Sequence, residues 1–260
     1  MNILFFGDVV ARSGRTELIR QLPGLKEKYE ADLTIVNGEN AAHGKGIIAG
    51  IYQELVSAGA DVVTTGNHVF SKKDIIRNFG NCPNLLRPLN LPGTQGHGYV
   101  IREVCGKKTA VVNVIGSVFM NMETLPAVRM TETLLDTIEA DVIVVDFHGE
   151  TTSEKITFAN YFCDRLTAVI GTHTHVQTAD ERIIRGCAFI SDAGMCGPYD
   201  SVLGRDTEEV IDRYIRLQNT QFTPSSSPAV ICGVLIQTDD TTNRAVRIER
   251  IQIRPNDQTD

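Results

Sequence analysis

Polar residues able to bind metals or move protons follow five short apolar runs of this 260-residue chain. A short apolar run predicts a buried strand, and in open α/β sheets the carboxyl ends of parallel strands are where ligands bind. Each residue alone has an ordinary explanation, because Asp and Asn often cap helices or form turns. Together they form a candidate site, made of Asp8, Asn37, Glu39, Asn40, Asn67, His68, His148, His173 and His175.

Four of the six histidines belong to this candidate site. His173 and His175 stand two residues apart in GTHTH, and in an extended segment that spacing puts both side chains on one side. Imidazole nitrogens with carboxylate and amide oxygens suit divalent Mn, Fe or Zn. The lack of thiolate ligands argues against a structural zinc or an iron–sulfur cluster. The set exceeds what one tetrahedral ion requires, so we expect two ions that share a carboxylate.

The rest of the sequence supplies the elements that would hold this site. Strands are expected at residues 2–7, 32–37, 61–65, 141–147, 166–171, 187–191, 229–237 and 245–253, helices at 13–29, 47–58, 74–79 and 153–165, and a hairpin at 98–104 and 108–115. Pro23 should break the first helix or mark its boundary. This alternation predicts an α/β fold. We expect two βα halves that form two sheets between helices, in a single domain over residues 1–260.

Composition excludes several classes of protein. Lys and Arg number 25 against 32 Asp and Glu, a net charge of −7 without a basic cluster, so no direct nucleic-acid-binding surface is evident. No apolar run approaches the roughly 18 residues of a membrane-spanning helix, and the N-terminus is expected to be a strand and not a signal peptide. The six cysteines are scattered without a CxxC pair, and four of them (Cys105, Cys163, Cys187 and Cys232) lie in or beside apolar runs, which predicts reduced core thiols and a cytoplasmic protein. Homo-oligomers are common enough that we expect one.

The ordered motifs GD, NGEN, GNH, HGE and GTHTH resemble those of the calcineurin-like metallophosphoesterase superfamily, in particular its YmdB-like branch. The flanking stretches NGENAAHGKGI and DAGMCGP also fit that branch, so the resemblance covers nearly the whole chain. It implies a four-layer αββα sandwich of two mixed sheets flanked by helices. It also implies two divalent metal ions as cofactors. The ligand types favour iron or manganese, with zinc as a further candidate.

The same resemblance assigns roles to residues. Asp8 and His175 would bind the first metal ion with Asn40 as an additional ligand, Glu39 would bridge both ions, and Asn67, His148 and His173 would bind the second. His68 would lie near the leaving group as a proton donor. The superfamily's usual D-x-H is Asp8-Val9-Val10 here, and its usual bridging Asp is Glu39. Both departures fit the YmdB-like branch, and they leave open which residue fills the vacant position on the first ion.

Further residues have two interpretations each. His43, in the glycine loop AAHGKG, and Arg12, just past Asp8, are candidate substrate contacts, with ordinary exposed positions as the alternative. Asp146 and Glu150 flank His148 and could orient metal ligands. For these two carboxylates we favour simple solvation.

These features predict a phosphohydrolase whose metal-bridging hydroxide attacks phosphorus in line. The resemblance points to a phosphodiesterase that acts on small cyclic nucleotides, including 2′,3′-cyclic ones, so the expected partner is a small phosphoester substrate and not a membrane. A phosphomonoesterase such as a 5′-nucleotidase would need much the same metal set. A regulatory or scaffold protein with a weakly active metal site is the alternative from another class, because the YmdB-like branch is associated with regulation of RNA turnover. A metal-dependent amidohydrolase fits less well, since it would use HxH in the first strand, where this sequence has Asp8.

Overall fold

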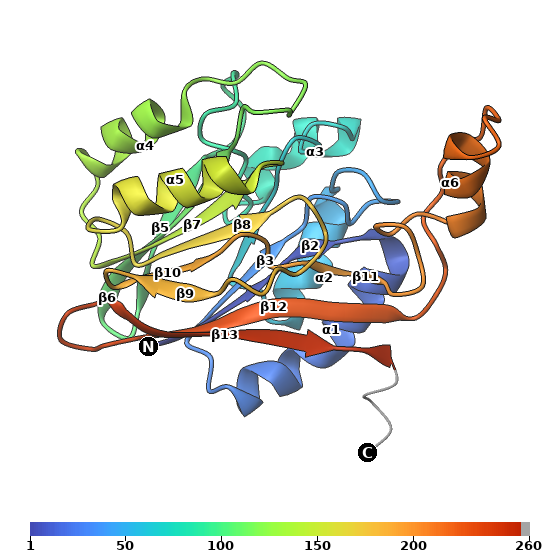
Figure 1. Cartoon of the computed structure of the whole chain (residues 1–260). Helices are drawn as coiled ribbons and strands as arrows, with labels where there is room; N and C mark the ends of the chain where they lie inside the picture. Colours follow the sequence, from blue (N-terminus) through green and yellow to red (C-terminus); the bar gives the residue numbers. More distant parts are fainter. Residues whose placement is uncertain (256–260) are drawn as a thin grey trace.

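Two β-sheets packed face to face form the centre of the molecule, with helices on both outer sides (Figure 1). The computed structural model describes residues 1–255. Within that range the first sheet has the order β2-β11-β12-β1-β3-β4, with β13 beside β12. Its strands are β1 (Asn2–Phe6), β2 (Asp8–Val9), β3 (Leu33–Asn37), β4 (Val62–Thr64), β11 (Met195–Pro198), β12 (Ala229–Thr238) and β13 (Ala245–Ile253). Because β1, β3 and β4 are parallel, their carboxyl ends reach the same edge of the sheet.

The second sheet has the order β5-β6-β7-β8-β10-β9. Its strands are β5 (Tyr99–Val104), β6 (Lys107–Ile115), β7 (Val142–His148), β8 (Ala168–Thr172), β9 (Arg182–Ile184) and β10 (Cys187–Ile190). The four central strands are parallel, whereas β5 and β9 pair antiparallel at the two edges. The antiparallel pairs β5-β6 and β12-β13 confirm the predicted hairpin and the predicted pairing at the end of the chain.

The helices cover the outer faces of the two sheets. On the first sheet lie α1 (Ala11–Lys28), α2 (Ala49–Ala58) and α3 (Lys73–Asn78), the last followed by a short 3₁₀ turn at Phe79–Asn81. On the second lie α4 (Ala127–Leu135) and α5 (Thr152–Phe162). The remaining helix, α6 (Thr207–Tyr214), projects away from both sheets (Figure 1).

Alternating side chains of the strands fill three apolar layers. In β1, Ile3 and Phe5 pack between the two sheets, whereas Leu4 and Phe6 pack against the helices of the first sheet. This is the period-2 geometry of a strand whose two faces are both buried, which is why the strand reads as a continuous apolar run. A third layer lies between the second sheet and its helices. The structure therefore confirms the expected α/β fold with a four-layer αββα arrangement.

Two sequence expectations about single residues were wrong. Pro23 does not break the first helix, because α1 continues through it to Lys28. Pro23 lies on the exposed side of α1, where water can bond the carbonyl group that proline leaves free, while Leu22 and Leu25 anchor the other side. All six cysteines have free thiols, but Cys105 is exposed in the β5–β6 turn and is not a core thiol.

The structure also contains elements that the sequence patterns did not specify. These are β2, β9, β11, α4 and α6. The three strands have two to four residues each, too few to show a period. Among residues 1–255, no helix combines the length and the apolar character that crossing a membrane demands.

Candidate metal centre

The carboxyl ends of strands from both sheets meet at one place and bring the predicted ligands together. From the first sheet come the residues that follow β1, β3 and β4, and from the second those that end β7 or follow β8. A cavity of about 580 Å³ opens there. Its lining includes Asn40, Asn67, His68, His173 and His175, while Asp8, Glu39 and His148 lie fully buried beneath. The structure therefore brings these strand ends together at one cavity, and the metal-binding roles of their residues stay a prediction.

Glu39 is held by backbone donors of the loop that follows β4. Its Oε2 accepts a hydrogen bond from the Gly66 N–H at 2.5 Å, and its Oε1 accepts one from the His68 N–H. A carboxylate has about four lone pairs, so both oxygens keep the capacity to bind a cation. Oε1 lies 3.9 Å from His148 Nε2. Glu39 is thus fixed in orientation at the centre of the cluster.

A chain of buried hydrogen bonds sets the orientation of His148. Thr172 Oγ1 donates to Asp146 Oδ1 at 2.7 Å and contacts His148 Nδ1 at 2.9 Å. Because the hydroxyl has a single hydrogen and gives it to the carboxylate, it accepts from the Nδ1–H group of His148. His148 Nε2 therefore presents a lone pair to the site, as in metal-binding histidines. Solvation, the favoured interpretation of Asp146, was wrong, because Asp146 is fully buried and belongs to this chain.

The donor atoms around His148 Nε2 fit a cation. Asn67 Oδ1 lies 3.0 Å from Nε2 and His173 Nδ1 lies 3.1 Å from it. Two ligands bound at right angles to an ion at about 2.1 Å are about 3 Å apart. Asp8 Oδ1 is buried, lacks a hydrogen-bond partner, and lies 3.9 Å from both His148 Nδ1 and His175 Nε2. A buried carboxylate oxygen without a donor is stabilised by a positive charge.

The same atoms are not arranged as a finished coordination shell. In residues 1–255, no three side chains of His, Cys, Asp or Glu form a group that could hold an ion as they stand. The donors contact one another instead: Asn40 Nδ2 lies 3.1 Å from His175 Nε2, and His173 Nε2 lies 3.1 Å from Glu150 Oε2. Small rotations of these side chains would be needed to bind an ion. Glu150, for which solvation was favoured, is half exposed and contacts His173.

The backbone conformation of the GTHTH segment differs from the extended one that was expected. His173 has φ 102° and His175 has φ 66°, so the segment is not extended. Left-handed conformations are unfavourable for residues with a β-carbon and persist where the surroundings enforce them. Thr174, between the histidines, donates its N–H and its hydroxyl to Asp192 Oδ2 at 2.9 and 2.8 Å. Both histidines still line the same cavity, which was the outcome predicted.

Burial controls the protonation of the cluster. It raises the pKa of Asp8 to about 7 and that of Asp146 to about 7, and it raises the pKa of Glu39 well above its usual range. The same loss of hydration lowers the pKa of His148, His173 and His175, the histidines predicted to be ligands. Buried carboxyl groups beside neutral imidazoles form a donor set whose negative charge a divalent cation would compensate.

His68 lines the cavity beside Asn67, as predicted from the GNH motif. Burial first and the Lys45 ammonium second lower the pKa of His68 to about 4. The imidazole is therefore neutral at pH 7 in this state. The proton-donor role predicted for it requires the negative charge of a bound phosphoester, which favours the imidazolium form.

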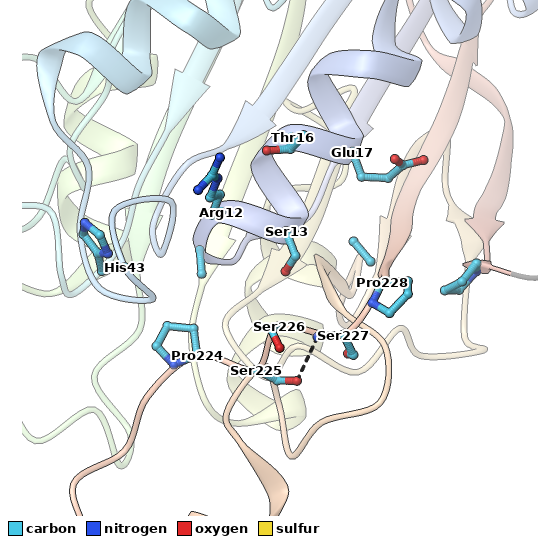
Figure 2. A pocket seen from close by; sticks show the side chains of 13 residues that line it. Arg12, Ser13, Thr16, Glu17, His43, Pro224, Ser225, Ser226, Ser227 and Pro228 are labelled. Carbon is cyan, nitrogen blue, oxygen red and sulfur yellow. Dashed lines mark hydrogen bonds between the residues drawn. The ribbon is translucent and has the colours of Figure 1, made fainter.

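The two predicted substrate contacts lie in a different cavity. Arg12 and His43 line a space of about 760 Å³ beside the start of α1, across from the loop of Ser225 to Ser227 (Figure 2). Both side chains are exposed. The structure therefore does not bring them together with the predicted metal ligands, and their contact with a substrate stays a prediction.

Sequence reasoning missed several residues that line this cavity, among them three large side chains. Arg205 is one, and its guanidinium donates to the Gly44 carbonyl at 2.9 Å. Tyr214 and Phe222 are two more. They follow the last recognisable motif and belong to no apolar pattern, so the sequence carries no signal for them beyond their side-chain type.

A family model described as YmdB-like protein matches residues 4–251. The chain belongs to the YmdB-like family. It is 45% identical to the 2′,3′-cyclic-nucleotide 2′-phosphodiesterase of Bacillus subtilis (strain 168) over 256 residues, 97% of each chain.

Solved structures agree with the assignment to the YmdB-like family. A crystal structure described as a novel phosphatase, from Mycoplasma pneumoniae, superposes with a TM-score of 0.93 at 37% identity, covering 97% of this chain and 93% of that one. A hypothetical protein from Thermus thermophilus gives a TM-score of 0.91 at 36% identity, covering 97% of this chain and 99% of that one. The NAD nucleotidase of Haemophilus influenzae, at 12% identity and a TM-score of 0.58 over 97% of this chain and 55% of that one, shows the shared fold alone. This YmdB-like chain therefore has the fold of a phosphoesterase.

Proposed function

We propose that this protein is a metal-dependent phosphodiesterase that hydrolyses 2′,3′-cyclic nucleotides. The observation that carries the proposal is the convergence of buried Asp8, Glu39 and His148 with cavity-lining Asn67 and the GTHTH histidines at the ends of five strands. The 45% identity to a 2′,3′-cyclic-nucleotide 2′-phosphodiesterase, over 97% of both chains, supports the substrate class.

The donor set fits two divalent ions. Asp8, His175 and Asn40 would hold the first ion, Asn67, His148 and His173 the second, and Glu39 would contact both. Nitrogen and oxygen donors without thiolates suit iron or manganese, with zinc as an alternative. When bound, such ions lower the pKa of a water molecule and offset the charge of phosphoryl oxygens.

The chain's own residues then have separate tasks. The N–H groups of Gly66 and His68 keep Glu39 in one orientation, and Thr172 keeps the Nε2 lone pair of His148 aimed at the site. Arg205 adds a guanidinium charge that attracts the phosphate. His68 would pass a proton to the departing 2′ oxygen as the bond from that oxygen to phosphorus breaks.

The test combines metal content with turnover. Protein purified without a metal-affinity tag should hold about two ions per chain by elemental analysis and should hydrolyse 2′,3′-cyclic AMP in a chelator-sensitive reaction. Glu39→Gln should lower kcat by at least about 100-fold, because ligand and near-ligand changes have effects of this order. The amide faces two N–H donors, so a loss of stability of about 1–3 kcal/mol is also expected, and activity must be compared on folded protein.

Glu54→Gln is the matched control, since Glu54 is half exposed and paired with Arg15 on the surface. It should leave metal content and turnover unchanged. Near-normal turnover by Glu39→Gln with metal retained would refute the bridging role. Faster hydrolysis of a 5′-monophosphate than of any diester would favour the monoesterase alternative. Metal-free protein that stays inactive with added manganese would favour the regulatory one. A single domain, a cytoplasmic location and a homo-oligomeric state stay predictions from the sequence.

A further inference from the structure

Two aromatic side chains form part of the wall of the metal-site cavity. Tyr214 and Phe222 both line it, and their rings stack with centroids 6.2 Å apart and planes at 29°. Val210, one helical turn before Tyr214, lines the same wall. His68 and His173 line the same cavity, so it combines polar and aromatic side chains.

The aromatic wall is not part of the hydrophobic core. It belongs to residues 205–223, a segment that we call the flap, which consists of α6 and the chain that returns from it. No residue of α6 is buried, and Tyr214 is 68% exposed. The flap beside the cavity projects away from both sheets (Figure 1). Packing in the hydrophobic core therefore does not explain the two aromatic rings at this position.

Hydrogen bonds of its own give the flap a defined shape. The Asp206 side chain caps α6 by accepting from the Glu209 N–H at 3.1 Å. The Glu209 carboxylate in turn accepts from the Thr223 N–H and hydroxyl at 2.5 and 2.8 Å. These bonds close the flap across its base. The flap is thus an ordered segment that holds Tyr214 and Phe222 at the cavity.

We propose that the flap is a nucleobase-binding subsite, in which the base of a substrate stacks on Tyr214 and Phe222 while its phosphate lies beside His68 and His173. The inference rests on the proposed function and adds the residues that select nucleotides over other phosphodiesters. Every base has a π-face, and stacking on aromatic side chains tolerates different bases. The guanidinium of Arg213 lies 6.0 Å from the Phe222 centroid, which adds a cation–π contact to that ring. A cavity of about 580 Å³ falls within the range that holds drug-sized ligands.

The test compares two substrates that differ only in the base. One is 2′,3′-cyclic AMP, and the other is the 2′,3′-cyclic phosphate of 1-O-methylribose. Tyr214→Ala and Phe222→Ala should raise KM for the nucleotide by about 5- to 150-fold with kcat little changed, because a uniform binding contact is lost. KM for the sugar phosphate should not change. Tyr214→Phe should behave as the wild type, and Ile215→Ala, exposed on the same flap, is the control that leaves the cavity wall intact.

A binding measurement makes the inference independent of turnover. Adenosine 3′-monophosphate and inorganic phosphate would be titrated calorimetrically into chelator-treated protein. The expected result is weaker nucleotide binding by Tyr214→Ala with phosphate binding unchanged. Equal effects on both probes, or no effect on the nucleotide, would overturn the subsite even if the enzyme is active. Base-dependent binding without hydrolysis would instead support the subsite and refute the proposed function.

Discussion

Lys155 is the buried group whose removal tests most directly how this site is held. Its side chain is fully buried, and Nζ donates to the Thr172 carbonyl at 2.8 Å and to Asp192 Oδ2 at 3.2 Å. Asp192 is the acceptor that also fixes Thr174 between the two histidines of GTHTH. The pair therefore ties α5 to the end of β8 and to the loop that carries His173 and His175. Lys155→Met keeps the length of the side chain and removes the charge.

The expected loss of stability in Lys155→Met follows from the Asp192 carboxylate, which would stay buried without its partner. Breaking a buried ion pair by removing one partner costs about 3–5 kcal/mol. Asp192 would keep its hydrogen bonds from Thr174 and Gly194, so the lower end of that range is expected. With an unfolding entropy of about 2.1 cal/mol/K per residue, a chain of this length should lose about 5–7 °C of Tm. Lys26→Met is the matched control, since Lys26 contacts the Gly59 carbonyl and Asp61 in the same way but is only part-buried, and about 1 kcal/mol or less is expected there.

The assay is scanning calorimetry on Lys155→Met, Asp192→Asn and the double variant. If the two side chains act as a pair, the second change should cost at least about 1 kcal/mol less in the background of the first than alone. Metal content measured on the same samples should fall in both single variants, because the GTHTH loop loses its anchor. Additive stability losses, or a cost for Lys155→Met no larger than that for Lys26→Met, would refute the reasoning.

Two further predictions concern the site itself. Gly66→Ala would put a β-carbon 2.2 Å from the ring atoms Cδ2 and Nε2 of His148, so metal content and turnover should fall by at least about 10-fold. Gly50→Ala is the control, because Gly50 lies in α2 with open space around it. This change should be neutral or should stabilise the protein by up to about 1 kcal/mol. Wild-type activity in Gly66→Ala would contradict the position assigned to His148. His68→Ala should slow substrates with alkoxide leaving groups more than p-nitrophenyl esters, since only the former need a proton. An equal loss for both would argue against proton donation by His68.

The parts of the site that sequence reasoning found are those encoded next to strands. Ile3 to Phe6 are apolar because both faces of β1 are buried, and Asp8 follows where the strand meets the sheet edge. The same local rule placed Glu39 after β3 and His148 at the end of β7. Parallel pairing then brings these strand ends together, so a one-dimensional pattern was enough to predict a three-dimensional cluster. The four-layer arrangement followed from the same alternation with the help of the family resemblance.

Residues that act through contacts with distant parts of the chain could not be predicted from a local sequence pattern. Asp146 lies near the end of an apolar strand and Lys155 lies in a helix of mixed polarity, and charged residues at such positions are usually solvated. Only the fold shows that Asp146 holds Thr172 and that Lys155 meets Asp192, 37 positions away. The positive φ values of His173 and His175 were equally invisible, because neither residue type requires them.

The flap was not predicted from the sequence, and its position indicates a role that differs from that of the strand ends. The proposed metal ligands end at His175, whereas Arg205, Tyr214 and Phe222 come later and reach the same cavity from outside the core. No layer of the sandwich depends on α6, so substitutions in the flap should alter which phosphoester binds at little expense in stability. Substitutions at Glu39 or His148 should instead abolish hydrolysis of every substrate. In this arrangement the strand ends determine the reaction, and the flap determines which molecules undergo it.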